Sequence, residues 1–91
     1  MVSQNVKIIN PTGLHLRPAG ILCKEALRFP CSVKFQFGNT VANAKSVLSV
    51  LGACVKSGDE ITMICDGIDE EKALSEMIAL IESGLGENCI C

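Results

Sequence analysis

Residues 31–43 read CSVKFQFGNTVAN and carry the clearest secondary-structure pattern in the chain. Apolar Val33, Phe35 and Phe37 alternate with polar neighbours, as in a strand that buries one face and leaves the other to water. Gly38 opens a two-residue turn, after which a short strand returns. The stretch therefore predicts a β-hairpin whose sheet needs a covering layer on one side.

The residues before the hairpin predict a strand, a loop and a helix. Residues 2–9 alternate as a first strand, and residues 16–28 carry apolar side chains at three- and four-residue spacing, which is helical periodicity. Pro18 falls in the first helical turn, where its missing N–H is harmless. Pro30 is expected to stop the helix, because the residue before a proline avoids the helical conformation.

The residues after the hairpin predict a short helix, a strand and a final helix. Ser46 is a good N-cap for the short helix, and residues 60–66 alternate again as a strand. Asp69 is expected to cap the final helix, which Gly84 ends. The buried stripe of that helix is expected to be Leu74, Met77, Ile78 and Ile81.

These elements predict the order β-α-β-β-α-β-α. Half-buried strands can leave one face in water, as antiparallel sheets do. We therefore expect an α+β open-faced sandwich, in which a four-stranded antiparallel sheet is covered on one side by three helices. A chain of 91 residues has room for one core, so we place a single domain at residues 1–87 and a short C-terminal tail at 88–91.

Composition and charge argue against several classes of function. The chain has eight Lys and Arg residues against ten acidic ones, and the cations are scattered, which argues against direct nucleic-acid binding. No apolar run approaches the ~18 residues of a membrane span. The first residues also lack the pattern of a secretory signal. We expect a cytoplasmic protein without membrane insertion.

The six cysteines form no C-x-x-C pair, and the chain has one histidine. Four of them lie in apolar segments, where a free cysteine behaves as a small hydrophobe. We therefore expect reduced thiols, no structural metal and no cofactor. Cys89 and Cys91 differ, since they lie on the predicted tail and are open to oxidation or crosslinking.

The histidine is the residue that points to chemistry. His15 stands immediately before the first predicted helix, in the stretch GLHLRPA at residues 13–19. A positive imidazolium opposes the positive end of the helix dipole, so this place favours the neutral ring that a nucleophile needs. A phosphoryl group on that ring would meet the free amides of the first helical turn, and Arg17 adds a cationic fork. The pattern indicates a site that holds a labile phosphoryl group.

The same stretch closely resembles the active-site signature of HPr, the histidine phosphocarrier family of the sugar phosphotransferase system. The resemblance runs from Val2 to about Glu87. It implies that His15 accepts a phosphoryl group at Nδ1 from enzyme I, which is charged from phosphoenolpyruvate, with Arg17 assisting. The carrier then passes the group to the IIA domains of sugar permeases. A protein of this kind is a substrate that turns over, not an enzyme, and we expect it to be a monomer.

A second site is implied at Ser46. The stretch Asn43-Ala44-Lys45-Ser46 resembles the regulatory serine segment of HPr proteins, although helix capping alone would explain a serine here. In Firmicute-type members this serine is phosphorylated by an ATP-dependent HPr kinase/phosphorylase. The product is a corepressor that binds a catabolite-control transcription factor. A phosphate adds about −1.5 to −2 charges, which a helix N-terminus tolerates well.

A carrier also needs a face that several proteins can bind and leave. The short helix cannot bury all its apolar residues on one stripe, and an exposed apolar patch beside a charged site typically marks a partner surface. We expect that surface to consist of Leu16, Gly20, Val47, Leu48 and Leu51.

Two departures from the family pattern stand in these helices. Gly20 weakens the first helix by up to about 1 kcal/mol relative to alanine. The stretch at residues 52–54, GAC, has its glycine earlier than the family often has it, so the exit of the short helix is expected to differ.

Two other functions remain open from the sequence. One is a mainly regulatory paralogue that binds transcription factors or enzymes and carries little sugar flux. Silent relatives replace the acceptor histidine, whereas this chain keeps His15. The other is a thiol-based redox or metal protein, suggested only by the number of cysteines.

Overall fold

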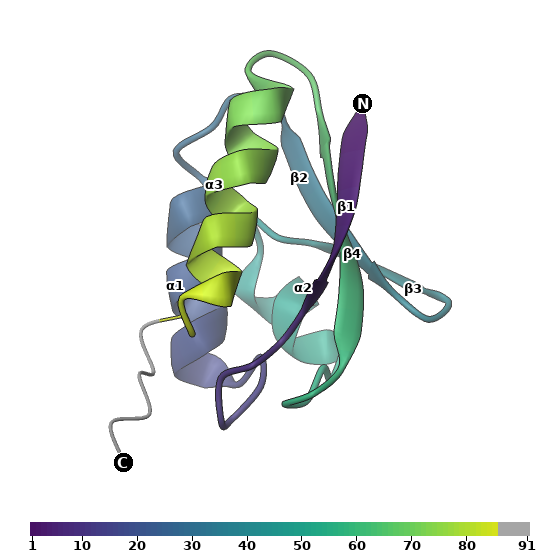
Figure 1. The fold of residues 1–91 in the computed structure, drawn as a ribbon, viewed down its shortest axis with the longest axis vertical. Helices are drawn as coiled ribbons and strands as arrows, with labels where there is room; N and C mark the ends of the chain where they lie inside the picture. Colours follow the sequence, from purple (N-terminus) through teal and green to yellow (C-terminus); the bar gives the residue numbers. More distant parts are fainter. Residues whose placement is uncertain (86–91) are drawn as a thin grey trace.

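The computed structural model describes residues 1–85 (Figure 1). Its elements follow the predicted order β-α-β-β-α-β-α. They are β1 (Val2–Lys7), α1 (Leu16–Ala26), β2 (Ser32–Phe37), β3 (Thr40–Asn43), α2 (Val47–Gly52), β4 (Glu60–Asp66) and α3 (Glu70–Glu82).

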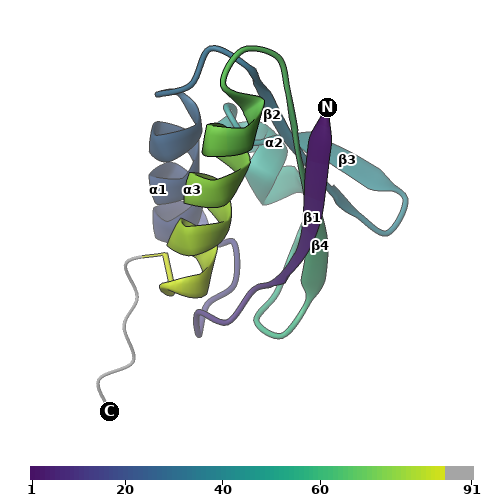
Figure 2. The same ribbon diagram turned by 45° about the horizontal axis from the view of Figure 1, so that its top comes forward.

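The strands form one antiparallel four-stranded sheet in the order β1-β4-β2-β3. The first and last strands in sequence are neighbours in the sheet. β1 pairs with β4 from Val2 opposite Cys65 to Lys7 opposite Glu60. The hairpin of β2 and β3 closes with Phe37 opposite Thr40, and Gly38 takes the positive φ of +60° that its turn position requires. The three helices cover one side of the sheet (Figure 2). The predicted open-faced sandwich is confirmed.

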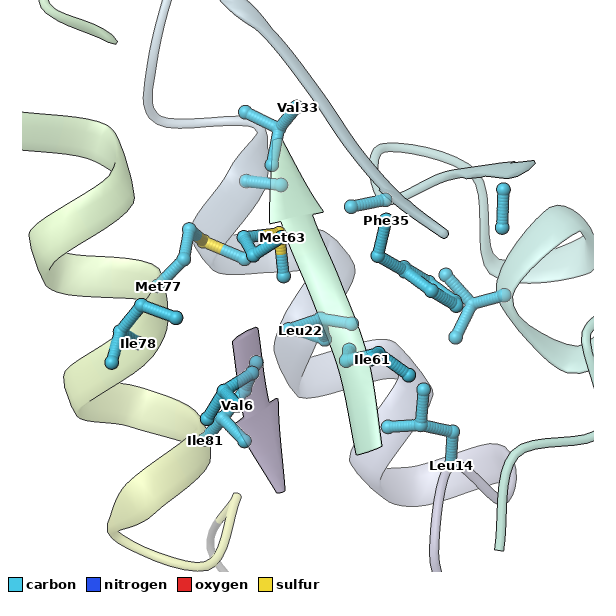
Figure 3. Packing of buried hydrophobic residues seen from close by; sticks show 14 of the residues in the cluster. Val6, Leu14, Leu22, Val33, Phe35, Ile61, Met63, Met77, Ile78 and Ile81 are labelled. Carbon is cyan, nitrogen blue, oxygen red and sulfur yellow. The ribbon is translucent and has the colours of Figure 1, made fainter. Parts of the chain in front are cut away.

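The core lies between the sheet and the helices. It is mostly aliphatic, as expected of a chain without Trp or Tyr, and the alternating residues Val33, Phe35, Ile61 and Met63 are fully or almost fully buried. Figure 3 shows side chains of the sheet meeting Leu22 of α1 and Met77, Ile78 and Ile81 of α3.

The first helix ends earlier than predicted. Periodicity indicates a helix over residues 16–28, whereas α1 stops at Ala26. The Arg28 amide donates to the Glu25 oxygen at 3.1 Å and the Phe29 amide to the Ala26 oxygen at 3.2 Å. These three-residue bonds tighten the chain out of α-helical geometry ahead of Pro30.

The expected cap of the last helix is wrong. Asp69 lies at the N-cap position but has a left-handed backbone (φ 62°), and its side chain makes no capping hydrogen bond. The extended backbone that aims a cap side chain at the first turn is absent here. Instead the Gly67 amide donates to Glu70 Oε1 at 3.0 Å, which closes the turn before α3. Glu70 and Glu71 still place negative charge in the first turn.

The buried stripe of α3 also differs by one residue. Met77, Ile78 and Ile81 are buried as predicted, whereas Leu74 is only half-buried and Ala73 takes the inner position. A hydrophobicity pattern favours the larger leucine over its small neighbour, which is why it selected Leu74.

One of the residues that follow α2 has a left-handed backbone. After Gly52 and Ala53, Cys54 adopts φ +57°, a conformation that glycine reaches without strain and other residues do not. Gly52 has no such φ and occupies the last helical position. Cys54 therefore carries the backbone strain at this exit, and the expected difference from the family pattern stays a prediction.

Candidate phosphoryl-transfer site

The loop before α1 is fixed to the loop before β4. The Ile8 amide donates to the Asp59 oxygen at 2.8 Å, and the Gly58 amide donates to the Ile8 oxygen at 2.7 Å. Farther along, the Leu14 amide donates to the Val55 oxygen at 3.0 Å. Two segments about 45 positions apart are thus joined at both ends.

Gly13 makes the closest approach in this junction. A Cβ built on Gly13 would lie 2.7 Å from the Lys56 Cα, 2.7 Å from the Val55 oxygen and 2.8 Å from the Ser57 nitrogen. Its φ of +68° is also left-handed. Both facts require glycine at this position, two residues before the histidine. Leu14 follows with its side chain in the core (Figure 3).

His15 is the N-cap residue of α1. Its backbone is extended (φ −82°, ψ −174°), its side chain is exposed, and the imidazole makes no capping hydrogen bond. The His15 carbonyl oxygen accepts the Ala19 amide at 2.8 Å. Within residues 1–85 the ring has no hydrogen-bond partner, so both ring nitrogens are free to react or to bind a partner protein.

The first turn of α1 has fewer free backbone amides than the sequence suggests. Pro18 has no N–H, and the Ala19 amide is already bonded to His15, so the first turn offers the amides of Leu16 and Arg17. The Arg17 side chain is exposed and makes no ion pair within the described part of the chain. The site can therefore present two backbone donors and one uncommitted guanidinium to an anion on the ring.

The five residues expected in the partner surface divide into two groups. Leu16, the first residue of α1, is 63% exposed, and Leu48 in α2 is 82% exposed. Both are strongly accessible apolar side chains. Gly20, Val47 and Leu51 are half-buried, and the last two pack against the core. Since α1 packs against α2, both exposed leucines belong to the same helical layer.

Ser46 caps α2 as predicted. Its Oγ accepts the Ser49 amide at 3.3 Å, and its own amide donates to the Asn43 oxygen at 3.0 Å. The neighbouring Lys45 is bonded to the turn that follows α1, because its Nζ donates to the Phe29 oxygen at 2.7 Å. The segment that carries Ser46 is thus anchored on both sides, while Ser46 itself stays half-buried.

Four of the six cysteines lie among the described residues. Cys23, Cys31 and Cys65 are buried and Cys54 is exposed, and all four are free thiols. Burial, with a smaller contribution from Cys31, raises the pKa of the Cys65 thiol to about 11, so this thiol stays protonated at neutral pH. Among residues 1–85 no group of three or more His, Cys, Asp and Glu side chains is placed to hold a metal ion. Cys89 and Cys91 lie outside the described residues, as does the tail predicted at 88–91.

Two further properties bear on the kind of site this is. A groove of about 470 Å³ lies between β1 and α3, and none of its lining residues belongs to the His15 region. No helix in residues 1–85 is long and apolar enough to cross a membrane.

One residue of the site escaped the sequence analysis. Asn10 is 1% exposed and its Nδ2 donates to the Gly13 oxygen at 2.6 Å, inside the loop that precedes His15. The sequence offers a polar residue in a turn-forming stretch, which is ordinary for a loop. Nothing in this local pattern indicates that the side chain is buried.

With this geometry described, known proteins provide the comparison. Residues 2–83 match the model of the family described as the PTS HPr component phosphorylation site. The chain belongs to the HPr family of phosphocarrier proteins. HPr-like protein Crh of Bacillus subtilis is 37% identical over 82 residues, which cover 90% of this chain and 96% of that protein.

Two further members match almost end to end. Phosphocarrier protein HPr of Lysinibacillus sphaericus is 34% identical over 88 residues, covering 96% of this chain and all of that protein. The crystal structure of HPr-C-His from Thermoanaerobacter tengcongensis superposes with a TM-score of 0.93 at 34% identity, covering 97% of this chain and 99% of that one. Membership of the HPr family and the fold predicted from the sequence are confirmed.

Proposed function

We propose that this HPr-family protein accepts a phosphoryl group on His15 from phosphorylated enzyme I and passes it to the IIA domains of sugar permeases. The observation that carries the proposal is the exposed, unpartnered imidazole of His15 at the N-cap of α1, beside Arg17. One chain supplies all these groups, so the proposed transfer needs no second copy of the protein.

The chemistry is a reversible transfer between nitrogens. A neutral ring nitrogen of His15, Nδ1 in the HPr family, attacks the phosphorus. The N–P bond to His15 forms as the bond between phosphorus and the donor breaks, and the donor keeps that bonding pair. The phosphoryl oxygens carry the negative charge, which the Leu16 and Arg17 amides and the Arg17 guanidinium stabilise. The reverse events at an acceptor return His15 to its free form.

Docking through an open apolar surface suits a carrier that must release each partner. Leu16 and Leu48 supply exposed apolar area, and Gly20, Val47 and Leu51 complete the proposed surface with smaller exposed portions. A weak, fast interface of this kind allows enzyme I and the IIA domains to use the same face in turn.

Ser46 is proposed as the regulatory site. Its hydroxyl stands at the N-terminus of α2, next to exposed Leu48, so a phosphate there would place negative charge within the partner surface. The modifying protein would be an ATP-dependent HPr kinase/phosphorylase, and the phosphorylated form would bind a catabolite-control transcription factor. The fold would change little, because the capping role of Ser46 tolerates an anion.

The direct test is phosphoryl labelling. Purified protein is mixed with enzyme I and phosphoenolpyruvate carrying ³²P, and the label is expected to be acid-labile and absent from a His15→Ala variant. Normal labelling of that variant would contradict the assignment. Ser46→Ala is the matched control, since it is expected to keep the label on His15 and to lose only labelling by the serine kinase with ATP.

A second candidate function has one observation in its favour. Crh, which is named as HPr-like, matches this chain at 37% identity, alongside HPr proteins at similar identity. A mainly regulatory paralogue would bind transcription factors or enzymes and would carry little sugar flux. The same labelling experiment separates the two, because the regulatory paralogue would turn over His15 slowly or not at all while retaining kinase-dependent labelling at Ser46.

A further inference from the structure

Asn10 is the only non-cysteine polar side chain that is buried within residues 1–85. Burying an amide lowers stability unless its hydrogen bonds are made, so an aliphatic residue would suit a site chosen for packing alone. The Asn10 Nδ2 donates to the Gly13 oxygen at 2.6 Å, a short and direct bond. The polar residue therefore fixes the course of the backbone.

Two hydrogen bonds of opposite direction join Asn10 and Gly13. While the Asn10 side chain donates to the Gly13 oxygen, the Gly13 amide donates to the Asn10 oxygen at 3.1 Å. Residues 10–13 thus form a small closed ring of backbone and side chain. This ring sets the left-handed conformation of Gly13, which is what allows it to lie against the backbone of residues 55–57.

The backbone between residues 10–13 and the His15 imidazole is short and held in place. Leu14 is the one residue between Gly13 and His15, and it is held by its amide bond to Val55 and by a side chain that is 3% exposed. The His15 ring itself has no side-chain partner within the described residues. The backbone that Asn10 holds therefore sets the point from which the ring projects.

We propose that Asn10 is a positioning residue for phosphoryl transfer at His15, acting through Gly13 and Leu14. The inference rests on the proposed function. Transfer requires the ring nitrogen in line with the phosphorus in each of two complexes, and small displacements of a reacting group lower rates strongly. Asn10 presents the ring in the same place to donor and acceptor without touching either.

Steady-state transfer from enzyme I tests this with Asn10→Ala and Asn10→Ser, neither of which can reach the Gly13 oxygen. The initial rate is measured against carrier concentration, at a temperature where circular dichroism shows each variant folded. We expect kcat to fall at least fivefold with KM within twofold of wild type, because the partner surface is intact. A purely structural role would act differently: partial unfolding lowers the competent concentration, so KM would rise and kcat would not change.

The matched control is Asn5→Ala. Asn5 Oδ1 accepts a hydrogen bond from Thr62 Oγ1 at 2.7 Å on an exposed part of β1, so this variant loses a side-chain hydrogen bond of similar length that does not involve the loop of residues 10–14. It is expected to keep wild-type kcat. Unchanged kcat in folded Asn10→Ser and Asn10→Ala, or a rise in KM alone, overturns the inference. If wild-type protein itself takes no label on His15, the proposed function fails instead.

Discussion

Replacing Gly13 by alanine tests the junction on which the His15 loop depends. Two separate penalties act on this variant. Holding a non-glycine residue at φ +68° costs about 1 kcal/mol. The new methyl carbon would also meet three backbone atoms at 2.7–2.8 Å, and backbone atoms cannot rotate away as a side chain does. Overpacking of this kind costs about 1–3 kcal/mol.

The expected loss in unfolding free energy is therefore about 2–4 kcal/mol. Gly38→Ala separates the two penalties, because Gly38 has a similar φ of +60° and no atom within 4 Å of its Cβ position. It should lose only the backbone part, about 1 kcal/mol. Any stabilisation through the unfolded chain is the same glycine-to-alanine effect in both variants and cancels in the difference.

Urea unfolding followed by far-ultraviolet circular dichroism is the suitable assay, since the chain has no Trp or Tyr to serve as a fluorescent probe. In a domain of this size each kcal/mol corresponds to about 4–8 °C in Tm, so the two variants should also separate clearly on heating. A loss in Gly13→Ala within about 0.5 kcal/mol of that in Gly38→Ala would refute the close approach between the two loops.

Three smaller changes are also predicted. Cys54→Gly relieves the left-handed strain at φ +57° and should raise the unfolding free energy by about 1 kcal/mol, measured by urea unfolding; a loss would show that Cys54 is unstrained. Gly20→Ala lies in α1 with no atom within 4 Å of its Cβ and should add about 0.5–1 kcal/mol in the same assay, whereas a loss would reveal an unseen contact. The Gly67 amide donates a hydrogen bond to the Glu70 carboxylate and is the main cause of its lowered pKa. The N-terminal amine of Met1 also donates to it and contributes less. The stabilising effect of this carboxylate is thus present above the unfolded pKa of about 4.3 and lost as pH falls through the lower folded value. Wild type should exceed Glu70→Gln in urea midpoint at pH 7 but not at pH 2, and a constant difference would contradict this.

Local patterns in the sequence were sufficient for the order of elements and for the place of His15. Alternation in residues 32–37 and 60–66, the proline at 30 and the Ser46 cap act over a few positions, so they are readable without the fold. The Asp69 cap failed because the turn at Gly67 competes for the start of α3 through Glu70. That choice depends on backbone geometry, which residue types alone do not determine.

The parts of the site that depend on distant segments were not predictable. Nothing in the sequence near Gly13 indicates that it lies against the backbone of residues 55–57, and nothing near Leu14 indicates that its amide bonds to Val55. The strain at Cys54 was predictable only in part. The sequence showed a glycine at position 52, and only the backbone showed that the left-handed conformation falls on Cys54.

The pairing of β1 with β4 has a consequence for how the protein is made. During synthesis the N-terminal strand has no neighbour in the sheet until residues 60–66 emerge, and the acceptor loop has nothing to fasten to until Val55 follows. At about 5–20 residues per second this leaves the nascent chain for several seconds with its histidine already translated but not yet held. A fragment that ends before Val55 therefore lacks the segment to which this loop is bonded, although it already contains His15.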